Sequence, residues 1–203
     1  MIRLILVRHA ETDWARQKRY QGKTDIPLNA RGLRQAACLR RRFRSEKFGI
    51  IYSSPLKRAQ KTVSVMLGSK NRNTLTDDRL MEISFGAWEG RNAEELLRSR
   101  NQSYLDWVRN GIFKPSGGEP LKKFRTRLQA FLKDVRRRHK DQNVLIMTHG
   151  GAVRTILMLV MKLGEHAMWS FRVEPASVSV LELDRDVCRM SLWNDTSHMR
   201  GFK

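Results

Sequence analysis

Mostly apolar runs at residues 2–7, 49–53 and 143–148 set the framework of this chain. They lack the alternation of a half-exposed strand and are typical of strands covered on both faces in a parallel sheet. Helical patterns between and after them predict helices over five segments: residues 29–46, 55–67, 92–108, 120–140 and 152–162. This order indicates an α/β fold, a three-layer sandwich with a mostly parallel central sheet and helices on both faces.

The remaining segments complete the expected architecture. Residues 177–183 and 188–193 alternate between apolar and polar side chains, which predicts a closing hairpin. Residues 85–119 contain Trp88, Trp107 and the Gly117-Gly118 pair, and we expect them to form a small cap over the site. A chain of 203 residues is long enough for one such domain, and no linker or repeat divides residues 1–203.

Cationic and nucleophilic side chains stand where two of the runs end. Arg8 and His9 follow the first run, and His149 follows the third, directly before Gly150. Ligands of open α/β sheets bind beyond the carboxyl ends of the strands, so we expect these groups to share one crevice. Arginine binds phosphate or carboxylate bidentately, a neutral imidazole acts as nucleophile or base, and glycine lets backbone N–H groups approach an anion. Taken singly, Arg8 and His9 also fit a strand-end salt bridge, and His149 also fits a hydrogen-bonded loop histidine.

A helix start follows the second run. Ser54 suits the N-cap and Pro55 the first helical position, which places Arg58 in the first turn. A cation there opposes the helix dipole. We therefore expect Arg58 to have an anionic partner.

Four motifs follow one another along the chain: LVRHAET at 6–12, SSPLKRA at 53–59, EISFGAWEG at 82–90 and THGG at 148–151. In this order they resemble the histidine phosphatase superfamily, the phosphoglycerate mutase-like proteins, over nearly the whole chain. Ala10 stands where glycine is more usual in that family. The resemblance implies that His9 accepts the phosphoryl group, that Glu82 donates a proton, and that phosphate is bound by Arg8, Arg58 and His149.

The chemistry of a phosphate monoester agrees with these roles. Its transition state spreads negative charge over the equatorial oxygens, so positioning and cationic donors carry most of the catalysis. Arg8 and Arg58 should keep His9 neutral, and its second ring nitrogen needs an acceptor, for which we expect a backbone carbonyl. No metal or other cofactor is required. Further substrate contacts are expected from Thr12, Gln21, Gly22 and Gly150.

The proton donor has competitors. A carboxyl group that faces a dianionic substrate has a reason to hold the proton that the leaving alkoxide needs. Glu11 and Glu89 are alternatives for this role, and Glu82 also fits the cap of the helix that follows it. We favour Glu82 because only its motif matches the family pattern.

One position departs from the family. After Trp14 the family commonly has an asparagine whose amide binds phosphate, and this chain has Ala15. Losing a hydrogen bond to a charged group costs about 1.5–3 kcal/mol if nothing replaces it. A water molecule, Arg16 or Gln21 is available as a replacement.

Within the family we favour a phosphomonoesterase that acts on small phosphorylated metabolites through a phosphohistidine. The segment 85–90 resembles the phosphatase branch, and residues 19–22, 25–28 and 117–119 are similar to α-ribazole phosphatases, which makes α-ribazole 5'-phosphate a candidate substrate. A cofactor-dependent phosphoglycerate mutase is the alternative. Because Ala15 replaces the phosphate-binding asparagine, an alternative of another class also stays open: a protein that has the phosphatase fold but only binds a phosphate ligand or nucleic acid.

Charge and hydropathy set the expected partners. Forty Lys and Arg against twenty Asp and Glu give a net charge of +20. Basic runs at 40–44 and 136–140 could bind the phosphate backbone of nucleic acid. Both runs lie on amphipathic helices without a recognised nucleic-acid motif, so we expect no specific nucleic-acid partner. No apolar run reaches the roughly 20 residues that span a membrane. We expect a cytoplasmic enzyme, and a homodimer is one possible oligomeric state.

Overall fold

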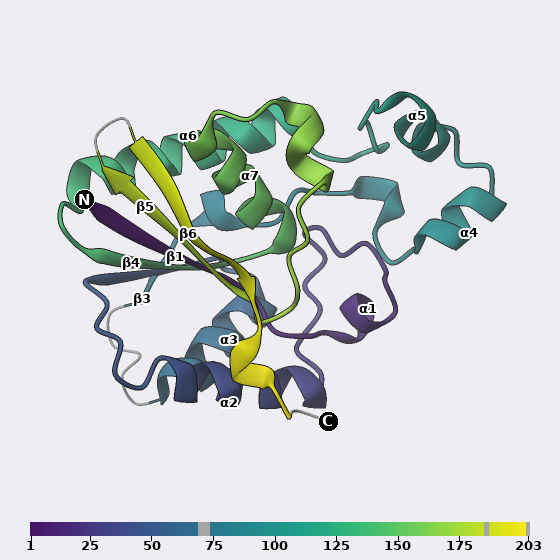
Figure 1. The fold of residues 1–203 in the computed structure, drawn as a ribbon. Helices are drawn as coiled ribbons and strands as arrows, with labels where there is room; N and C mark the ends of the chain where they lie inside the picture. Colours follow the sequence, from purple (N-terminus) through teal and green to yellow (C-terminus); the bar gives the residue numbers. More distant parts are fainter. Residues whose placement is uncertain (69–73, 185–186, 202–203) are drawn as a thin grey trace.

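The computed structural model describes residues 1–68, 74–184 and 187–201. Its centre is a six-stranded sheet (Figure 1) with the strand order β3-β2-β4-β1-β5-β6. The first four strands in this order are parallel and the last two are antiparallel to their neighbours. Their bounds are β1 Ile2–Arg8, β2 Ile50–Ser53, β3 Thr74–Thr76, β4 Asn143–Thr148, β5 Val178–Asp184 and β6 Val187–Asp195.

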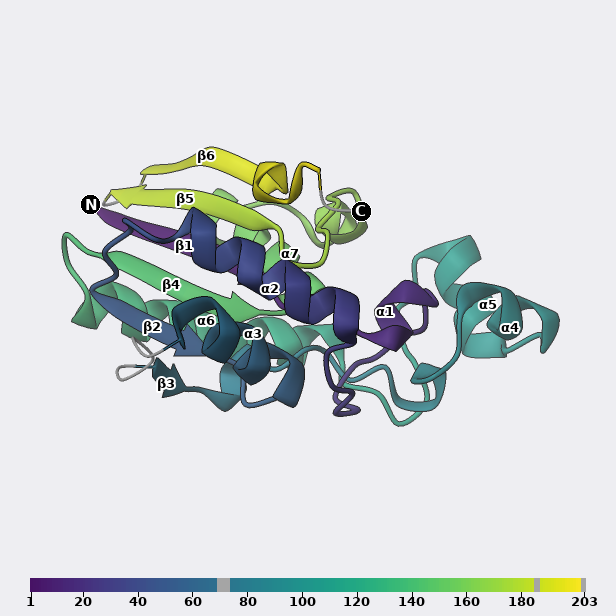
Figure 2. The same cartoon turned by 90° about the horizontal axis from the view of Figure 1, so that it is seen from below.

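Helices cover both faces of this sheet. Figures 1 and 2 show α2 (Ala30–Arg42) and α3 (Lys57–Leu67) on one face, and α6 (Leu121–Arg138) and α7 (Gly150–Met161) on the other. The expected α/β sandwich with a mostly parallel sheet is confirmed, as is the closing hairpin of β5 and β6.

The side chains of β1 explain why its sequence is apolar without alternation. Leu4 and Leu6 pack into the core beneath α6 and α7, whereas Ile5 and Val7 pack into the core beneath α2 and α3. All four are completely buried. A strand that fills two cores has no solvent face on which polar residues would be tolerated.

The shorter elements gather near the end of the sheet where β1 and β4 finish (Figure 1). They include the helices α1 (Asp13–Arg16), α4 (Ala93–Arg98) and α5 (Gln102–Asn110). Short 3₁₀ helices complete the described elements: η2 Asp78–Leu80, η3 Gly86–Trp88, η4 Glu165–Trp169 and η5 Ser197–Met199. Within segment 85–119, Trp88 is fully buried and stacks on Trp107 with the ring centroids 5.4 Å apart. The Trp107 ring also meets Trp169 at 5.0 Å, which ties this segment to η4.

Three helix predictions were wrong, one because the helix is interrupted and two because an end lies elsewhere. The helix expected over 92–108 is two helices, because Arg100 adopts a φ of +48° and Asn101 caps α5 through its side chain. The helix expected from residue 29 to 46 ends at Arg42, after which Phe43 packs edge-on against Phe48. The helix expected from residue 152 begins two residues earlier, at Gly150.

The start of α3 was also predicted wrongly. Leu56, not Ser54, is the N-cap residue, and it makes no side-chain cap. The Ser54 hydroxyl lies 2.7 Å from Nε2 of His149 instead. A further strand, β3, was not predicted. None of the described helices is sufficiently long and apolar to traverse a bilayer.

Candidate active site

The register of β1 and β4 brings the two central histidines together. Arg8 pairs with Thr148, so His9 and His149 leave the sheet side by side. The backbone N–H of His9 donates to the carbonyl of Thr148 at 2.8 Å, and the two imidazole centroids are 5.1 Å apart. Parallel pairing of strands far apart in the chain thus builds the expected crevice at their carboxyl ends.

A cavity of about 170 Å³ opens at this point. Seven of the residues expected at the site line it: Arg8, His9, Gln21, Gly22, Arg58, Glu82 and Gly150. Two others, Thr12 and His149, are completely buried behind this lining. The structure therefore brings all nine together, seven at the surface of the cavity and two behind it.

The surroundings of His9 favour its neutral imidazole. Its Nδ1 lies 2.7 Å from the carbonyl oxygen of Ala10, which only accepts, so Nδ1 carries the proton and Nε2 keeps its lone pair. Burial, followed by the charges of Arg58 and Arg8, holds the pKa of His9 well below its usual value. The expected carbonyl partner is present, and the lowered pKa agrees with the expected neutral state.

Arg58 is anchored by carbonyl groups. Its Nη1 and Nη2 donate to the carbonyl oxygens of Thr24 at 2.8 Å and Gly22 at 2.7 Å, and Nε donates to Nδ1 of His149 at 3.2 Å. Burial lowers the pKa of its guanidinium to about 10. The anionic partner expected for this first-turn cation is not among the described ion pairs, because the carbonyl oxygens of residues 22–24 take its place.

His149 has the opposite tautomer from His9. Since its Nδ1 accepts from Arg58, the proton resides on Nε2, which donates to the Ser54 hydroxyl. Burial and the charge of Arg58 keep its pKa well below the usual value. His149 and Ser54 therefore support Arg58 from behind.

Arg8 keeps an unused donor beside the cavity. Its Nη1 donates to the carbonyl of Val173 at 2.5 Å, whereas its buried Nε has no hydrogen-bond partner in the described structure. Burial and the nearby Arg154 lower the pKa of Arg8 to about 10. An anion in the cavity would offset the cost of burying this cation.

Glu82 lies opposite the histidines at the start of α7. Its carboxylate accepts the backbone N–H of Gly151 at 2.9 Å and that of Ile83 at 3.0 Å. It therefore caps α7, and not the helix that follows it in sequence. The alternative acids Glu11 and Glu89 do not line the cavity.

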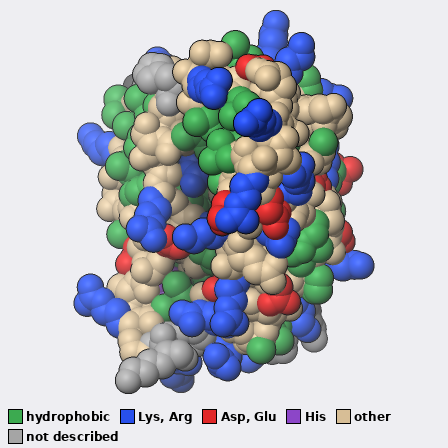
Figure 3. All heavy atoms as spheres, turned by 90° about the vertical axis from the view of Figure 1, so that its right-hand side faces the viewer, with side chains coloured by type: hydrophobic (Ala, Val, Ile, Leu, Met, Phe, Trp, Pro, Cys, Tyr) green, Lys and Arg blue, Asp and Glu red, His purple; other side chains and the backbone are tan. Residues whose placement is uncertain are grey.

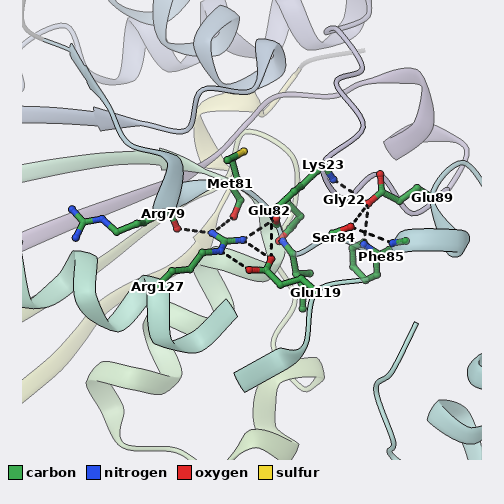
Figure 4. Close-up of polar contacts among 12 residues, drawn as sticks. Gly22, Lys23, Arg79, Met81, Glu82, Ser84, Phe85, Glu89, Glu119 and Arg127 are labelled. Carbon is green, nitrogen blue, oxygen red and sulfur yellow. Dashed lines mark hydrogen bonds and ion pairs between the residues drawn. The ribbon is translucent and has the colours of Figure 1, made fainter. Parts of the chain in front are cut away.

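A partly buried arginine on α6 supports the backbone that carries Glu82 (Figure 4). Arg127 donates to the carbonyl oxygens of Arg79, Met81 and Glu82 at 2.6, 2.7 and 3.0 Å. Its remaining donors bind both carboxylate oxygens of Glu119 at 2.9 Å. Burial would raise the pKa of Glu119, but the bond from Arg127 holds it below its usual value.

Glu89 joins two loops of the site (Figure 4). Its carboxylate accepts backbone N–H groups of Lys23, Thr24 and Phe85 at 2.9–3.1 Å. Gly22 has a φ of +54°, and a Cβ on it would lie 1.9 Å from Oε1 of Glu89. Only glycine fits there without displacing the carboxylate, and the Gly22 carbonyl is then free to anchor Arg58.

The comparisons with known proteins agree with this geometry. The sequence profile of the histidine phosphatase superfamily (branch 1) matches residues 4–196. The chain belongs to the histidine phosphatase superfamily. Phosphoserine phosphatase 1 of Hydrogenobacter thermophilus is 34% identical over 203 residues, covering 100% of this chain and 96% of the relative.

Two further relatives are named as α-ribazole phosphatases. The adenosylcobalamin/α-ribazole phosphatase of Escherichia coli is 28% identical, over 95% of this chain and 96% of the relative. The crystal structure of the α-ribazole phosphatase from Shigella flexneri superposes with a TM-score of 0.85 at 28% identity, over 95% of this chain and 96% of the other. These relatives confirm the sequence-based assignment of this histidine phosphatase to enzymes that hydrolyse small phosphorylated metabolites.

The structure of this histidine phosphatase narrows the replacements available at Ala15. Arg16 is exposed and does not line the cavity, so it is not the substitute. Gln21 does line the cavity, and its carbonyl end accepts from the Thr12 hydroxyl at 2.8 Å. That bond directs the amide end of Gln21 away from Thr12, which makes it the candidate donor.

Sequence reasoning missed six residues of the cavity: Arg19, Tyr20, Phe85, Gly151, Arg154 and Trp169. One signal for Arg154 was available, because it stands four residues after Gly150, on the same face of the helix. The aromatic residues come from loops and from η4, and these segments meet only in the folded chain. Within the described ranges, no group of three or more His, Cys, Asp or Glu is arranged to hold a metal ion.

Proposed function

We propose that this chain hydrolyses small phosphate monoesters through a phosphohistidine at His9. The observation that carries the proposal is the neutral imidazole of His9, held by the Ala10 carbonyl with Nε2 unprotonated beside Arg8 and Arg58. A lone pair among cationic donors is the arrangement that phosphoryl transfer to nitrogen needs.

The reaction has two halves. In the first, Nε2 of His9 attacks phosphorus, the ester P–O bond breaks, and the departing alkoxide takes the proton of Glu82. In the second, Glu82 takes a proton from water, the resulting hydroxide attacks phosphorus, and the N–P bond breaks. The products are the alcohol and inorganic phosphate, and His9 and Glu82 return to their starting states.

The other residues of the site have supporting roles in this proposal. Arg8 and Arg58 stabilise charge on the equatorial oxygens, and the N-terminus of α7 adds backbone donors at Gly150. Thr12 orients Gln21, Gly22 anchors Arg58, and His149 fixes the orientation of Arg58. Residues 85–119 act as a cap that limits the size of the ester.

Replacing the nucleophile tests the proposal. His9→Ala should lower turnover of p-nitrophenyl phosphate by roughly 10⁴-fold or more with the circular dichroism unchanged, because no other nucleophile lies at this strand end. The matched control His139→Ala, whose ring contacts Tyr52 far from the cavity, should retain activity. Rapid quenching of the wild type with radiolabelled substrate should trap an acid-labile phosphoenzyme. Substantial turnover by His9→Ala would contradict the mechanism.

The reaction products distinguish a phosphatase from a phosphoglycerate mutase. Incubation with 3-phosphoglycerate should release phosphate, because Glu82 activates water against the phosphohistidine. Interconversion of 3- and 2-phosphoglycerate stimulated by the bisphosphate would instead identify a mutase. A panel that includes phosphoserine and α-ribazole 5'-phosphate then ranks the substrates.

The partners expected from the sequence follow from this function. The substrate is a small phosphorylated metabolite, and the reaction requires no specific nucleic acid. Such esters are present in the cytoplasm, which is the expected location of the enzyme. A homodimer would leave this chemistry unchanged, because all the proposed catalytic groups come from one chain.

A further inference from the structure

A third arginine of the cavity is not used by the reaction described above. Arg154 lies on α7, lines the cavity, and donates from Nε to the carbonyl of Phe171 at 2.6 Å. Its guanidinium also lies over the Trp169 ring, 5.6 Å from the centroid. These two contacts hold the side chain in place and leave the outer nitrogens of the guanidinium for a ligand.

The charges of the cavity wall are not balanced. Arg19 is paired with Glu95, whereas Arg8, Arg58 and Arg154 form no ion pair with any carboxylate in the described ranges. Burial lowers the pKa of Arg154 below its usual value, and Glu82 and Glu174 oppose this shift without pairing with Arg154. A bound phosphate monoester brings about two negative charges, which matches Arg8 and Arg58 and leaves one arginine over.

The position of Arg154 indicates what this remaining charge would bind. Gly150 stands at the start of α7, and the four residues from it to Arg154 advance the helix by about 6 Å. Trp169, which is 37% exposed, marks the open side of the cavity beside Arg154. Arg154 therefore lies between the phosphate end and the mouth, where the alcohol part of an ester would be.

We propose that Arg154 is a second anion subsite, which selects phosphate esters that carry a carboxylate two carbon atoms from the ester oxygen. Phosphorylated hydroxy acids and hydroxy amino acids have this form, and their short length suits a cavity of about 170 Å³. A guanidinium held by one bond at Nε presents its other edge for bidentate binding of a carboxylate. This inference rests on the proposed function, since it names the substrate class of that same site.

Two pairs of esters that differ only at the carboxylate test the subsite. One pair is phosphoserine and phosphoethanolamine, and the other is 3-phosphoglycerate and glycerol 3-phosphate. We expect the wild type to favour the carboxylated member of each pair by about 10-fold or more in kcat/KM, mainly through KM. Arg154→Met should reduce this preference to about 1, and Arg154→Lys should retain part of it.

The readout is the ratio within each pair, because Arg154→Met also loses the bond to Phe171 and can lower all activities together. Arg172→Met, at an exposed arginine paired with Glu174, is the matched control and should keep the wild-type ratio. An equal loss on both members of a pair would show that Arg154 binds the phosphate or only supports the loop, and would overturn the subsite. A wild type without preference would overturn it as well. If the wild type turns over none of the four esters and not even p-nitrophenyl phosphate, the proposed function fails together with the subsite.

Discussion

At the scale of single residues, the site depends on keeping two histidines uncharged. His9 and His149 are both buried and lie beside arginines, and each has its proton on the nitrogen that faces a hydrogen-bond acceptor. Arg58 is involved in both cases, because its charge disfavours either imidazolium and its Nε bond selects the tautomer of His149.

This arrangement predicts how stability depends on pH. The folded-state pKa of both histidines lies below the unfolded value near 6.5, so only the unfolded chain takes up protons in the window between them. The free energy of unfolding should be fully retained above pH 6.5 and fall below it, by up to about 1.4 kcal/mol per pH unit for each histidine. Urea denaturation at pH 7.5, 6.5 and 5.5 measures this. His9→Asn should show a shallower fall, and an unchanged fall would contradict the assignment.

Individual residues also show where sequence reasoning succeeds. Arg8, His9 and Glu82 were predicted because each follows a recognisable pattern in the chain, and the structure places all three at the cavity. The only sequence signal for Arg154 is its four-residue spacing from Gly150, and this spacing points to the site only when the opposite wall of the cavity is known. The carbonyl partners of Arg58 were not predicted, since backbone carbonyls of a loop leave no trace in side-chain composition.

At the scale of elements, the segment that carries Glu82 is held by α6 as well as by the sheet, where the Thr148 hydroxyl at the end of β4 donates to the carbonyl of Leu80 at 2.6 Å. Arg127 binds three carbonyl groups of this segment, those of Arg79, Met81 and Glu82, and Glu119 completes the coordination of its guanidinium. The geometry of the proton donor therefore depends on a residue that does not line the cavity.

Leaving-group chemistry tests this dependence. Arg127→Met should lower kcat/KM for glycerol 3-phosphate by roughly 100-fold, because its alkoxide needs the proton from Glu82. The loss with p-nitrophenyl phosphate should be far smaller, since a nitrophenolate leaves without protonation. In a Glu82→Gln background the Arg127 substitution should add little. Arg137→Met, an exposed position on the same helix, is the control. Equal losses with both esters would mean that Arg127 acts only on stability.

The elements themselves were predictable to different extents. Strands that fill two cores have sequences without alternation, so β1, β2 and β4 were found close to their true ends. The break between α4 and α5 was missed, because it depends on a left-handed Arg100 that helical periodicity does not exclude. The short edge strand β3 has only three residues and a partly exposed pattern, which is too little for a period to be recognised.

At the scale of the whole molecule, positive charge dominates the surface. Figure 3 shows Lys and Arg side chains spread over the face that looks toward the right of Figure 1, with fewer acidic groups among them. The net charge of +20 gives long-range attraction for anions, whereas the buried arginines of the cavity act at contact distance.

Ionic strength separates these two effects. Raising NaCl from 50 to 500 mM should lower kcat/KM for a dianionic ester by roughly 2–5-fold and leave kcat nearly constant, because screening acts on exposed charges beyond the Debye length.

Nucleic acid should bind weakly and lose binding steeply with salt. Arg41→Glu with Arg137→Glu should remove that binding without changing hydrolysis. Tight binding at physiological salt would favour the nucleic-acid alternative.

The central place of β1 has a consequence for how the protein is made. The strand β1, which ends at Arg8 directly before His9, is synthesised well before its hydrogen-bonding neighbours β4 and β5, which begin at residues 143 and 178. Pairing between such distant segments is slow, because the entropy of closing the loop is lost before the contacts form. During translation β1 therefore remains an apolar, unpaired segment in need of protection from aggregation. A nascent chain that stops before β5 should lack phosphatase activity, since β1 then lacks one of the two strands that hold it in place.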